Sequence, residues 1–238
     1  MPSTAKSRQV AQAALRWFGG ATAARLLLAE QSELIPALTG VHGRHALYLR
    51  PAAAGNRTLS GHLLGDVLNL HACADGSWRG DICCGRDGFP LADDSLALVY
   101  LLHTLDHCLY PEYLLREAAR LLQPDGCLIS VGLNPWSLWS WRWRGRGLQA
   151  RTQGKTGRLI EGAGLTLLRR FQLGPVSPFD LADLPRAPGQ RTSFASGLRA
   201  GYAWCARKRV QTLTPDVSAA RRRARLVGGR TEAAPNAG

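Results

Sequence analysis

His103, Asp106 and His107 form a short run of titratable side chains directly after an apolar segment, Leu96–Leu102. An imidazole with an ordinary pKa of about 6.5 can take up or release a proton at neutral pH, and a nearby carboxylate can orient its ring. We therefore interpret His103 and His107 as candidate catalytic residues that orient or deprotonate the group of a substrate that reacts. The alternative is a strand-end turn that caps the following helix.

A metal site is a second interpretation of the same run, because the spacing His-x-x-Asp-His resembles the inverted zinc-peptidase pattern His-x-x-Glu-His. That pattern requires one helix that carries both histidines. Here His103 and His107 follow a predicted buried strand instead. The sequence therefore predicts no metal site.

The elements around these histidines predict an α/β fold. Leu96–Leu102 is an unbroken apolar run, typical of a strand covered on both faces of a parallel sheet. Pro111 suits the first turn of a helix, and the turn at 123–126 ends that helix. Cys127–Leu133 follows as a second buried strand, so the unit is strand, crossover helix, strand.

Further elements extend this unit into a Rossmann-like, doubly wound, mostly parallel sheet of about seven strands. Residues 1–40 are expected to form N-terminal covering helices broken at Gly19 and Gly20, residues 41–212 the main domain, and residues 213–238 a disordered basic tail. The other predicted elements are strands at His45–Arg50, Val67–Cys73, Ile82–Cys84, Leu165–Leu173 and Ala200–Val210, and a helix at Lys155–Gly164.

Charge is distributed unevenly along the chain. Residues 1–138 hold 11 basic and 12 acidic side chains, whereas residues 139–238 hold 19 and 5. An arginine-rich half of this kind is compatible with an anionic partner such as nucleic acid, but uniform arginine usage with abundant alanine and glycine also fits simple codon bias. A dense aromatic and basic segment, 139–146, suits stacked or anionic partners, a membrane surface, or alternate tryptophans packed in the domain.

The chain also lacks features of export. It has no segment of about 20 apolar residues that could cross a bilayer and no recognisable signal peptide. Its six cysteines include no Cys-x-x-Cys pair, which favours reduced thiols in a core. We therefore expect a cytoplasmic protein without a transmembrane segment.

The segment Leu91–Gly132 resembles the second half of the domain in class I S-adenosylmethionine-dependent methyltransferases, especially the type 11 group. The later segments Asn134–Trp139 and Gly201–Val210 are similar to a bacterial subgroup of methyltransferase-like proteins. The residues that carry the resemblance are Pro90-Leu91, Asp94-Ser95, Leu105 with His107, Leu115-Arg116-Glu117, Arg120 and Pro124-Asp125-Gly126.

The resemblance implies S-adenosylmethionine as cofactor. In that family a glycine-rich loop after strand one meets the methionine part, an acid after strand two holds the ribose, and a polar loop after strand three meets adenine. The positions that correspond in this chain are Leu49, Arg50, Ala52, Asp75, Asp87 and Leu102. Asp75 and Asp87 each stand beside a glycine, so simple turn residues are the alternative. The stretch 48–55 departs from the family, because it contains neither the acid nor the Gly-x-Gly-x-Gly loop.

Two functions follow as hypotheses. The first is methyl transfer from S-adenosylmethionine to an unidentified acceptor, with Asn134 and Trp136 as substrate-binding residues beyond the next strand. The second is a catalytically inactive protein of the methyltransferase fold, which binds nucleic acid or an acidic partner through its basic C-terminal half.

Overall fold

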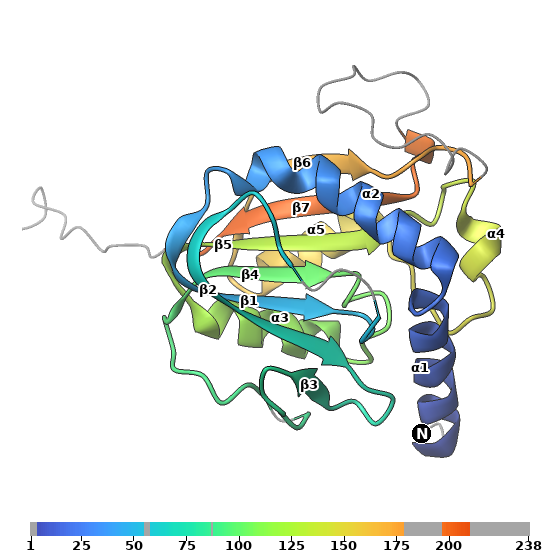
Figure 1. Cartoon of the computed structure of the whole chain (residues 1–238), viewed down its shortest axis with the longest axis horizontal. Coiled ribbons are helices and arrows are strands. Elements are labelled where there is room, and N and C mark those ends of the chain that lie inside the picture. Colours follow the sequence, from blue (N-terminus) through green and yellow to red (C-terminus); the bar gives the residue numbers. More distant parts are fainter. Residues whose placement is uncertain (1–3, 55–57, 87, 179–196, 210–238) are drawn as a thin grey trace, which may run out of the picture.

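A computed structural model of the chain describes residues 4–54, 58–86, 88–178 and 197–209. Within them a seven-stranded sheet has the strand order β3-β2-β1-β4-β5-β7-β6, with helices on both faces (Figure 1). The strands are β1 (His42–Arg50), β2 (Leu63–Ala72), β3 (Trp78–Gly80), β4 (Leu96–Leu102), β5 (Leu122–Leu133), β6 (Thr166–Leu173) and β7 (Gly201–Arg207). The helices are α1 (Thr4–Phe18), α2 (Ala21–Leu38), α3 (Pro111–Leu121), α4 (Ser140–Trp143) and α5 (Gln153–Gly162).

The centre of the sheet is parallel. Strands β2, β1, β4 and β5 run in the same direction, whereas β3, β7 and β6 pair antiparallel with their neighbours. Every residue of β4 is buried, as its continuous apolar sequence predicts for a central strand. The predicted Rossmann-like, mostly parallel sheet of seven strands is therefore confirmed.

Two apolar cores lie on opposite faces of the sheet, because successive side chains of a strand point to opposite sides. Tyr48 and Tyr100 point toward α2, where their rings meet edge to face with centroids 5.3 Å apart. Leu49 and Leu101 point to the other face and pack in the core that contains α3 and α5. The N-terminal helices thus cover one face, and the crossover helix α3 covers the other.

The connection between β1 and β2 is unusual for two parallel neighbours, which are ordinarily joined by a helix. Neither of its described parts, 51–54 and 58–62, contains a helix. The face above β1 is instead covered by α2, which precedes β1 in the chain, and the Gln31 side chain donates to the hydroxyl of Tyr48. The helix break at Gly19, which was expected, lets α2 turn onto the sheet.

The predicted third strand at Ile82–Cys84 is wrong. The strand lies earlier, at Trp78–Gly80, and pairs antiparallel with β2. The reason is a tight turn between the strands, in which Gly76 has a φ of +86° and its N–H donates to Cys73 O at 2.9 Å. Because this turn reverses the chain at once, the following segment forms a hairpin. Cys84 only bridges back to Trp78.

The other predicted boundaries differ by a few residues. The turn expected at 123–126 lies inside β5, where the register against β4 shifts between Leu96 and Leu98 and Asp125 has a φ of +61°. The disordered tail predicted at 213–238 lies outside the described residues. None of the helices in the described part of the chain is long and apolar enough to span a membrane.

Candidate active site at the carboxyl edge of the sheet

His103 lies directly beyond the last residue of β4, at the edge where the parallel strands end. Its backbone takes the left-handed conformation, with a φ of +48°, and its N–H donates to Val131 O at 3.0 Å. The next residue, Thr104, donates its hydroxyl to Leu49 O on β1 at 3.2 Å. The chain therefore stays attached to both neighbouring strands as it leaves β4.

Both ring nitrogens of His103 are bonded to buried carboxylates. Nε2 lies 2.6 Å from Glu30 Oε2, and Nδ1 lies 2.9 Å from Asp106 Oδ2. Burial alone would lower the pKa of His103, but the two carboxylates outweigh it and raise that pKa to about 9. The ring therefore carries a proton on each nitrogen at neutral pH, and it cannot act as a base while both bonds hold.

Asp106 extends this cluster into β5. Its Oδ2 also accepts a hydrogen bond from Leu133 N at 2.8 Å, and its backbone oxygen accepts one from Gln149 N at 2.6 Å. Burial raises the pKa of Asp106, although its bonds to His103 and Leu133 oppose the rise. The cluster of Glu30, His103 and Asp106 thus joins α2, the end of β4 and the end of β5.

Sequence reasoning did not identify Glu30 as part of the site. The available signal was its place on α2, four residues after Leu26 and four residues before Leu34, both of which are fully buried. A carboxylate on the apolar stripe of a helix needs a buried partner. The protonated ring of His103 provides it.

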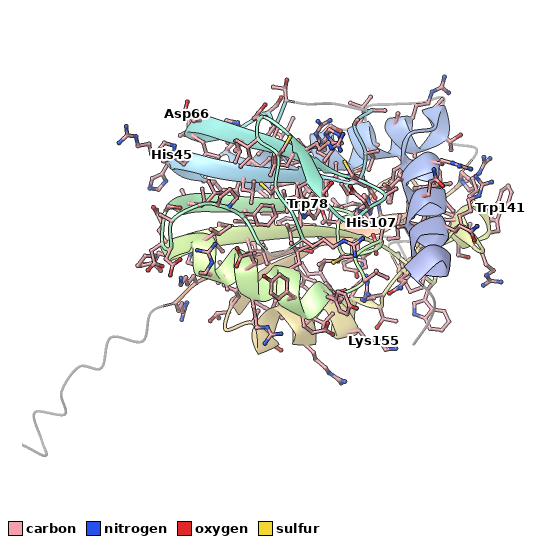
Figure 2. All side chains as sticks on the ribbon, turned by 90° about the horizontal axis from the view of Figure 1, so that it is seen from below. His45, Asp66, Trp78, His107, Trp141 and Lys155 are labelled. Carbon is pink, nitrogen blue, oxygen red and sulfur yellow. The ribbon has the colours of Figure 1, made fainter. Side chains whose placement is uncertain are left out.

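His107, the second predicted catalytic residue, has the opposite electrostatic character. Burial and the charge of His103 lower the pKa of His107 to about 4, so its ring is neutral at pH 7. Its Nε2 is buried without a hydrogen-bond partner in the described structure, and its ring lies 6.2 Å from that of Phe18. Figure 2 shows His107 beside α1, beyond the ends of the strands. Among the described residues, no group of three or more His, Cys, Asp or Glu side chains is arranged to hold a metal ion.

The predicted cofactor residues of β1 and β4 are buried in the two cores rather than exposed at an open edge. Leu49, Ala52 and Leu102 pack among apolar side chains. Arg50 is 3% exposed and its Nη1 donates to Ala53 O at 3.2 Å. In this conformation the guanidinium therefore supports the 51–54 turn.

Of the two aspartates predicted to hold the ribose and adenine, only Asp75 lies within the described residues. Asp75 is exposed in the turn between β2 and β3, where its Oδ1 accepts hydrogen bonds from Ser77 N at 2.9 Å and Ser77 Oγ at 2.6 Å. These two bonds lower the pKa of Asp75. Asp87 lies outside the described residues.

Asn134 and Trp136, the predicted substrate-binding residues, follow β5 but have different surroundings. Asn134 Nδ2 donates to Gly197 O at 2.8 Å and to Arg199 O at 2.9 Å, and its Oδ1 accepts from Trp136 N at 3.1 Å. Asn134 is thus a buried connector of two loops. The side chain of Trp136 points outward and is 74% exposed.

Comparison with known proteins identifies this architecture. Residues 69–130, from β2 into β5, match the family model described as a methyltransferase domain. This part of the chain is therefore similar to a methyltransferase domain. An uncharacterized protein of Escherichia coli K12, YafS, is 47% identical over 53 residues, a match that spans only 22% of either chain.

Solved methyltransferases share the fold at low sequence identity. A SAM-dependent methyltransferase of Thermotoga maritima superposes with a TM-score of 0.56 and 17% identity, covering 82% of this chain and 94% of that one. A SAM-dependent methyltransferase of Aquifex aeolicus gives a TM-score of 0.52 and 12% identity, covering 82% and 96%. These likenesses concern the fold alone.

Two charged residues of the segment that matches the methyltransferase domain, Glu117 and Arg120, have a structural role here. Glu117 Oε1 accepts from Phe89 N at 3.0 Å, and Arg120 donates to Glu117, to Leu91 O at 3.0 Å and to Phe89 O at 3.1 Å. Both side chains come from α3 and hold the loop that leads into β4. The motif therefore fixes the position of that loop.

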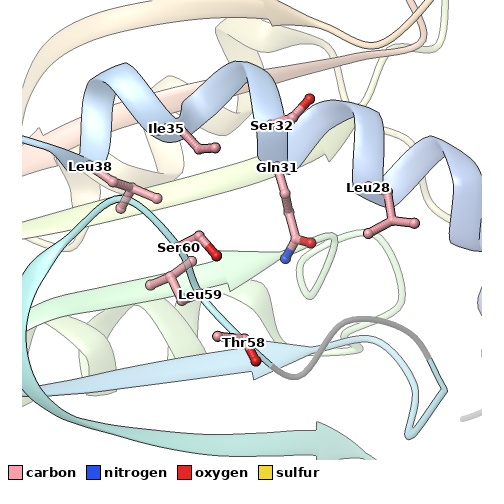
Figure 3. Close-up of a pocket in the computed structure, with 8 residues that line it drawn as sticks. All are labelled: Leu28, Gln31, Ser32, Ile35, Leu38, Thr58, Leu59 and Ser60. Carbon is pink, nitrogen blue, oxygen red and sulfur yellow. The ribbon is translucent and has the colours of Figure 1, made fainter. Parts of the chain in front are cut away.

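The described residues do not fit the usual methyltransferase contacts to the methionine and ribose parts of the cofactor. Arg50 lies where the family has an acid, Ala52 packs into a core, and Asp75 is bonded within its own hairpin. Two hollows stand out in the described structure, and neither is lined by a predicted site residue. One, of about 150 Å³, lies between α2 and residues 58–60 (Figure 3), and the other, of about 360 Å³, lies beside α5.

Proposed function

We propose that this methyltransferase-family protein transfers a methyl group from S-adenosylmethionine to an acceptor that is not yet identified. The observation that carries the proposal is the reversal of strand order between β1 and β4, since β2 lies on one side of this pair and β5 on the other. Open α/β sheets bind their ligands at the carboxyl ends of the strands at such a switch point. The domain match across β2 to β5 supports the same edge.

The proposal requires cofactor contacts that differ from the usual ones, because Arg50 and Asp75 are bonded within their own turns. Methyl transfer needs the acceptor aligned with the methyl group, and it needs a base only where the acceptor keeps its proton. His107, neutral at pH 7, is the better candidate for that base, since His103 is bonded through both nitrogens.

Titration calorimetry with S-adenosylmethionine and S-adenosylhomocysteine tests the proposal. We expect dissociation constants of about 1–100 μM, which correspond to about 5–8 kcal/mol. Ala53→Arg places bulk on an exposed position just beyond β1 and should weaken binding about tenfold or more. Leu63→Arg, on a side chain that is 70% exposed at the amino end of β2, is the matched control and should leave binding unchanged. The absence of both binding heat and a thermal shift at millimolar ligand would refute the proposal.

A second candidate is favoured by the bonds already made at this edge. Arg50, Asp75 and His103 are each bonded within the protein, as expected of a family member that has lost catalysis. Its function would then be to bind nucleic acid or an acidic protein through the basic half. Retention of the full chain on nucleic acid, strongly weakened by salt and unaffected by S-adenosylmethionine, would support this candidate.

A further inference from the structure

The segment Pro135–Gly147 presents some tryptophans to the core and others to solvent. Trp139 and Trp143 are buried; Trp139 Nε1 donates to Pro175 O at 3.1 Å, and the Trp143 ring lies 5.8 Å from that of Trp17, edge to face. Trp136 and Trp141 point outward and are 74% and 59% exposed. The inward tryptophans thus fix the segment to the domain and leave the outward ones available for contact.

The exposed apolar side chains of this segment lie close together in sequence. Between Trp136 and Trp141, Leu138 is also 50% exposed, so three large apolar side chains face solvent within one short stretch. We name Trp136, Leu138 and Trp141 the apolar tip. Figure 2 shows Trp141 projecting at one end of the molecule, opposite the end that carries His45 and Asp66. Large exposed apolar residues gathered in this way mark an interaction site.

The surroundings of the apolar tip are basic. The Arg142 guanidinium lies 4.7 Å from the centre of the Trp141 ring, and Arg144 and Arg146 are exposed nearby in sequence. From residue 126 to residue 160 the chain contains six arginines and lysines and no aspartate or glutamate. A partner that covers the tip must therefore combine negative charge with an apolar layer.

We propose that the apolar tip inserts into the interface of an anionic lipid membrane, with the neighbouring arginines bound to lipid headgroups. Tryptophan favours the headgroup region, and long arginine side chains keep their charge in water while their stems lie along apolar surface. Leucine beside the tryptophans favours lipid over single-stranded nucleic acid, because an aliphatic side chain cannot stack on a base. A projecting tip also suits a flat surface, whereas strand binding uses a basic groove.

Co-sedimentation of the full chain with vesicles tests this proposal. We expect binding to phosphatidylcholine vesicles that contain about a third phosphatidylglycerol, and little binding to phosphatidylcholine alone. The variant Trp136→Ser/Trp141→Ser should bind the anionic vesicles about tenfold more weakly. The matched control Leu63→Ser/Tyr110→Ser removes two side chains that are 70% and 72% exposed elsewhere and should bind like the wild type.

The charge contribution is tested separately. Arg144→Gln/Arg146→Gln should weaken binding to the anionic vesicles about tenfold or more, whereas Arg44→Gln/Arg79→Gln, also on exposed side chains, should have little effect.

All the substituted side chains are exposed, and unchanged melting temperatures would show that each variant folds. Absence of vesicle binding would overturn the proposal, as would equal binding by wild type and the double tryptophan variant. Retention on a single-stranded oligonucleotide that depends on Trp141, without vesicle binding, would assign the tip to nucleic acid instead.

Discussion

Glu30 Oε2 lies 2.6 Å from His103 Nε2, although 73 positions separate the two residues, and neither side chain is exposed to solvent. A buried charge pair of this kind gains little over an apolar pair, but removal of one partner leaves the other charge uncompensated. The N-terminal helix α2 is therefore joined to the end of β4 by charge as well as by apolar packing. It is part of the fold that shapes the candidate site.

The shifted pKa values of His103 and His107 predict that the free energy of unfolding is largest near pH 6.5. The pKa of His103 is raised to about 9, so its contribution is fully present below about pH 6.5 and is lost as the pH rises through 9. The pKa of His107 is lowered to about 4, so its contribution is present above about pH 6.5 and is lost as the pH falls toward 4. Urea unfolding at a series of pH values measures both limbs.

Two variants test whether the alkaline loss of stability comes from His103 and the acid loss from His107. Glu30→Gln removes the charge that raises the pKa of His103, so the loss of stability between pH 6.5 and 9, on the order of 3 kcal/mol in the wild type, should shrink. His107→Leu should flatten the acid limb relative to the wild type, since its titration is gone. Raised pKa values of Asp106 and Glu33 also act in acid, which is why the difference between variant and wild type is measured. Parallel wild-type and variant curves would contradict the assignment.

Gly201, the first residue of β7, depends on the same carboxylate. A Cβ atom at this position would collide with Glu30 Oε1 and would lie 3.1 Å from Gly132 O. Gly201→Ala should therefore lower the free energy of unfolding of the wild type. The same substitution made in the Glu30→Ala variant should lower it by about 1–3 kcal/mol less. Glu30→Ala alone should cost about 3–5 kcal/mol, because it leaves His103 without its partner. A double-mutant cycle by urea unfolding measures the coupling, and strictly additive costs would disprove the contact.

Strands and helices could be predicted from the sequence where the spacing of their apolar residues matches one type of element. Leu96–Leu102 was predicted with the same bounds that the structure gives, because a buried parallel strand requires an unbroken apolar run. The helix from Pro111 was equally clear, since proline suits the first turn and the leucines share one face. The prediction of a strand at Ile82–Cys84 was wrong because a tight turn at Gly76 brings the chain back antiparallel to β2 earlier than expected. Such a turn depends on backbone conformation, and the spacing of apolar residues does not reveal it.

The candidate site was harder to predict because its chemistry depends on distant partners. The sequence placed His103 correctly after the central strand, but only the packing of α2 shows that Glu30 occupies its second nitrogen. Asp75 had the right residue type after β2, yet its carboxylate is bonded to Ser77 two residues away. Residue type and strand position therefore indicate a site, whereas the partners of each polar atom decide what it can do.

The motif residue Arg120 provides a test of that distinction. Its guanidinium donates to Glu117, to Phe89 O and to Leu91 O, so a lysine of equal charge cannot replace its planar set of donors. Arg120→Lys should lower the free energy of unfolding by about 1–3 kcal/mol and speed hydrogen exchange of the Phe89 amide.

The neighbouring Arg116 is the matched control for this substitution. It is exposed and donates one long hydrogen bond, 3.4 Å to Glu112 O on its own helix. Arg116→Lys should therefore change the free energy of unfolding by less than about 0.5 kcal/mol. Thermal unfolding should separate the two variants by roughly 2–12 °C, given about 2–4 °C per kcal/mol for a domain of this size. Equal melting temperatures would mean that the position of the loop before β4 does not depend on Arg120, and its presence in the motif would then need another explanation.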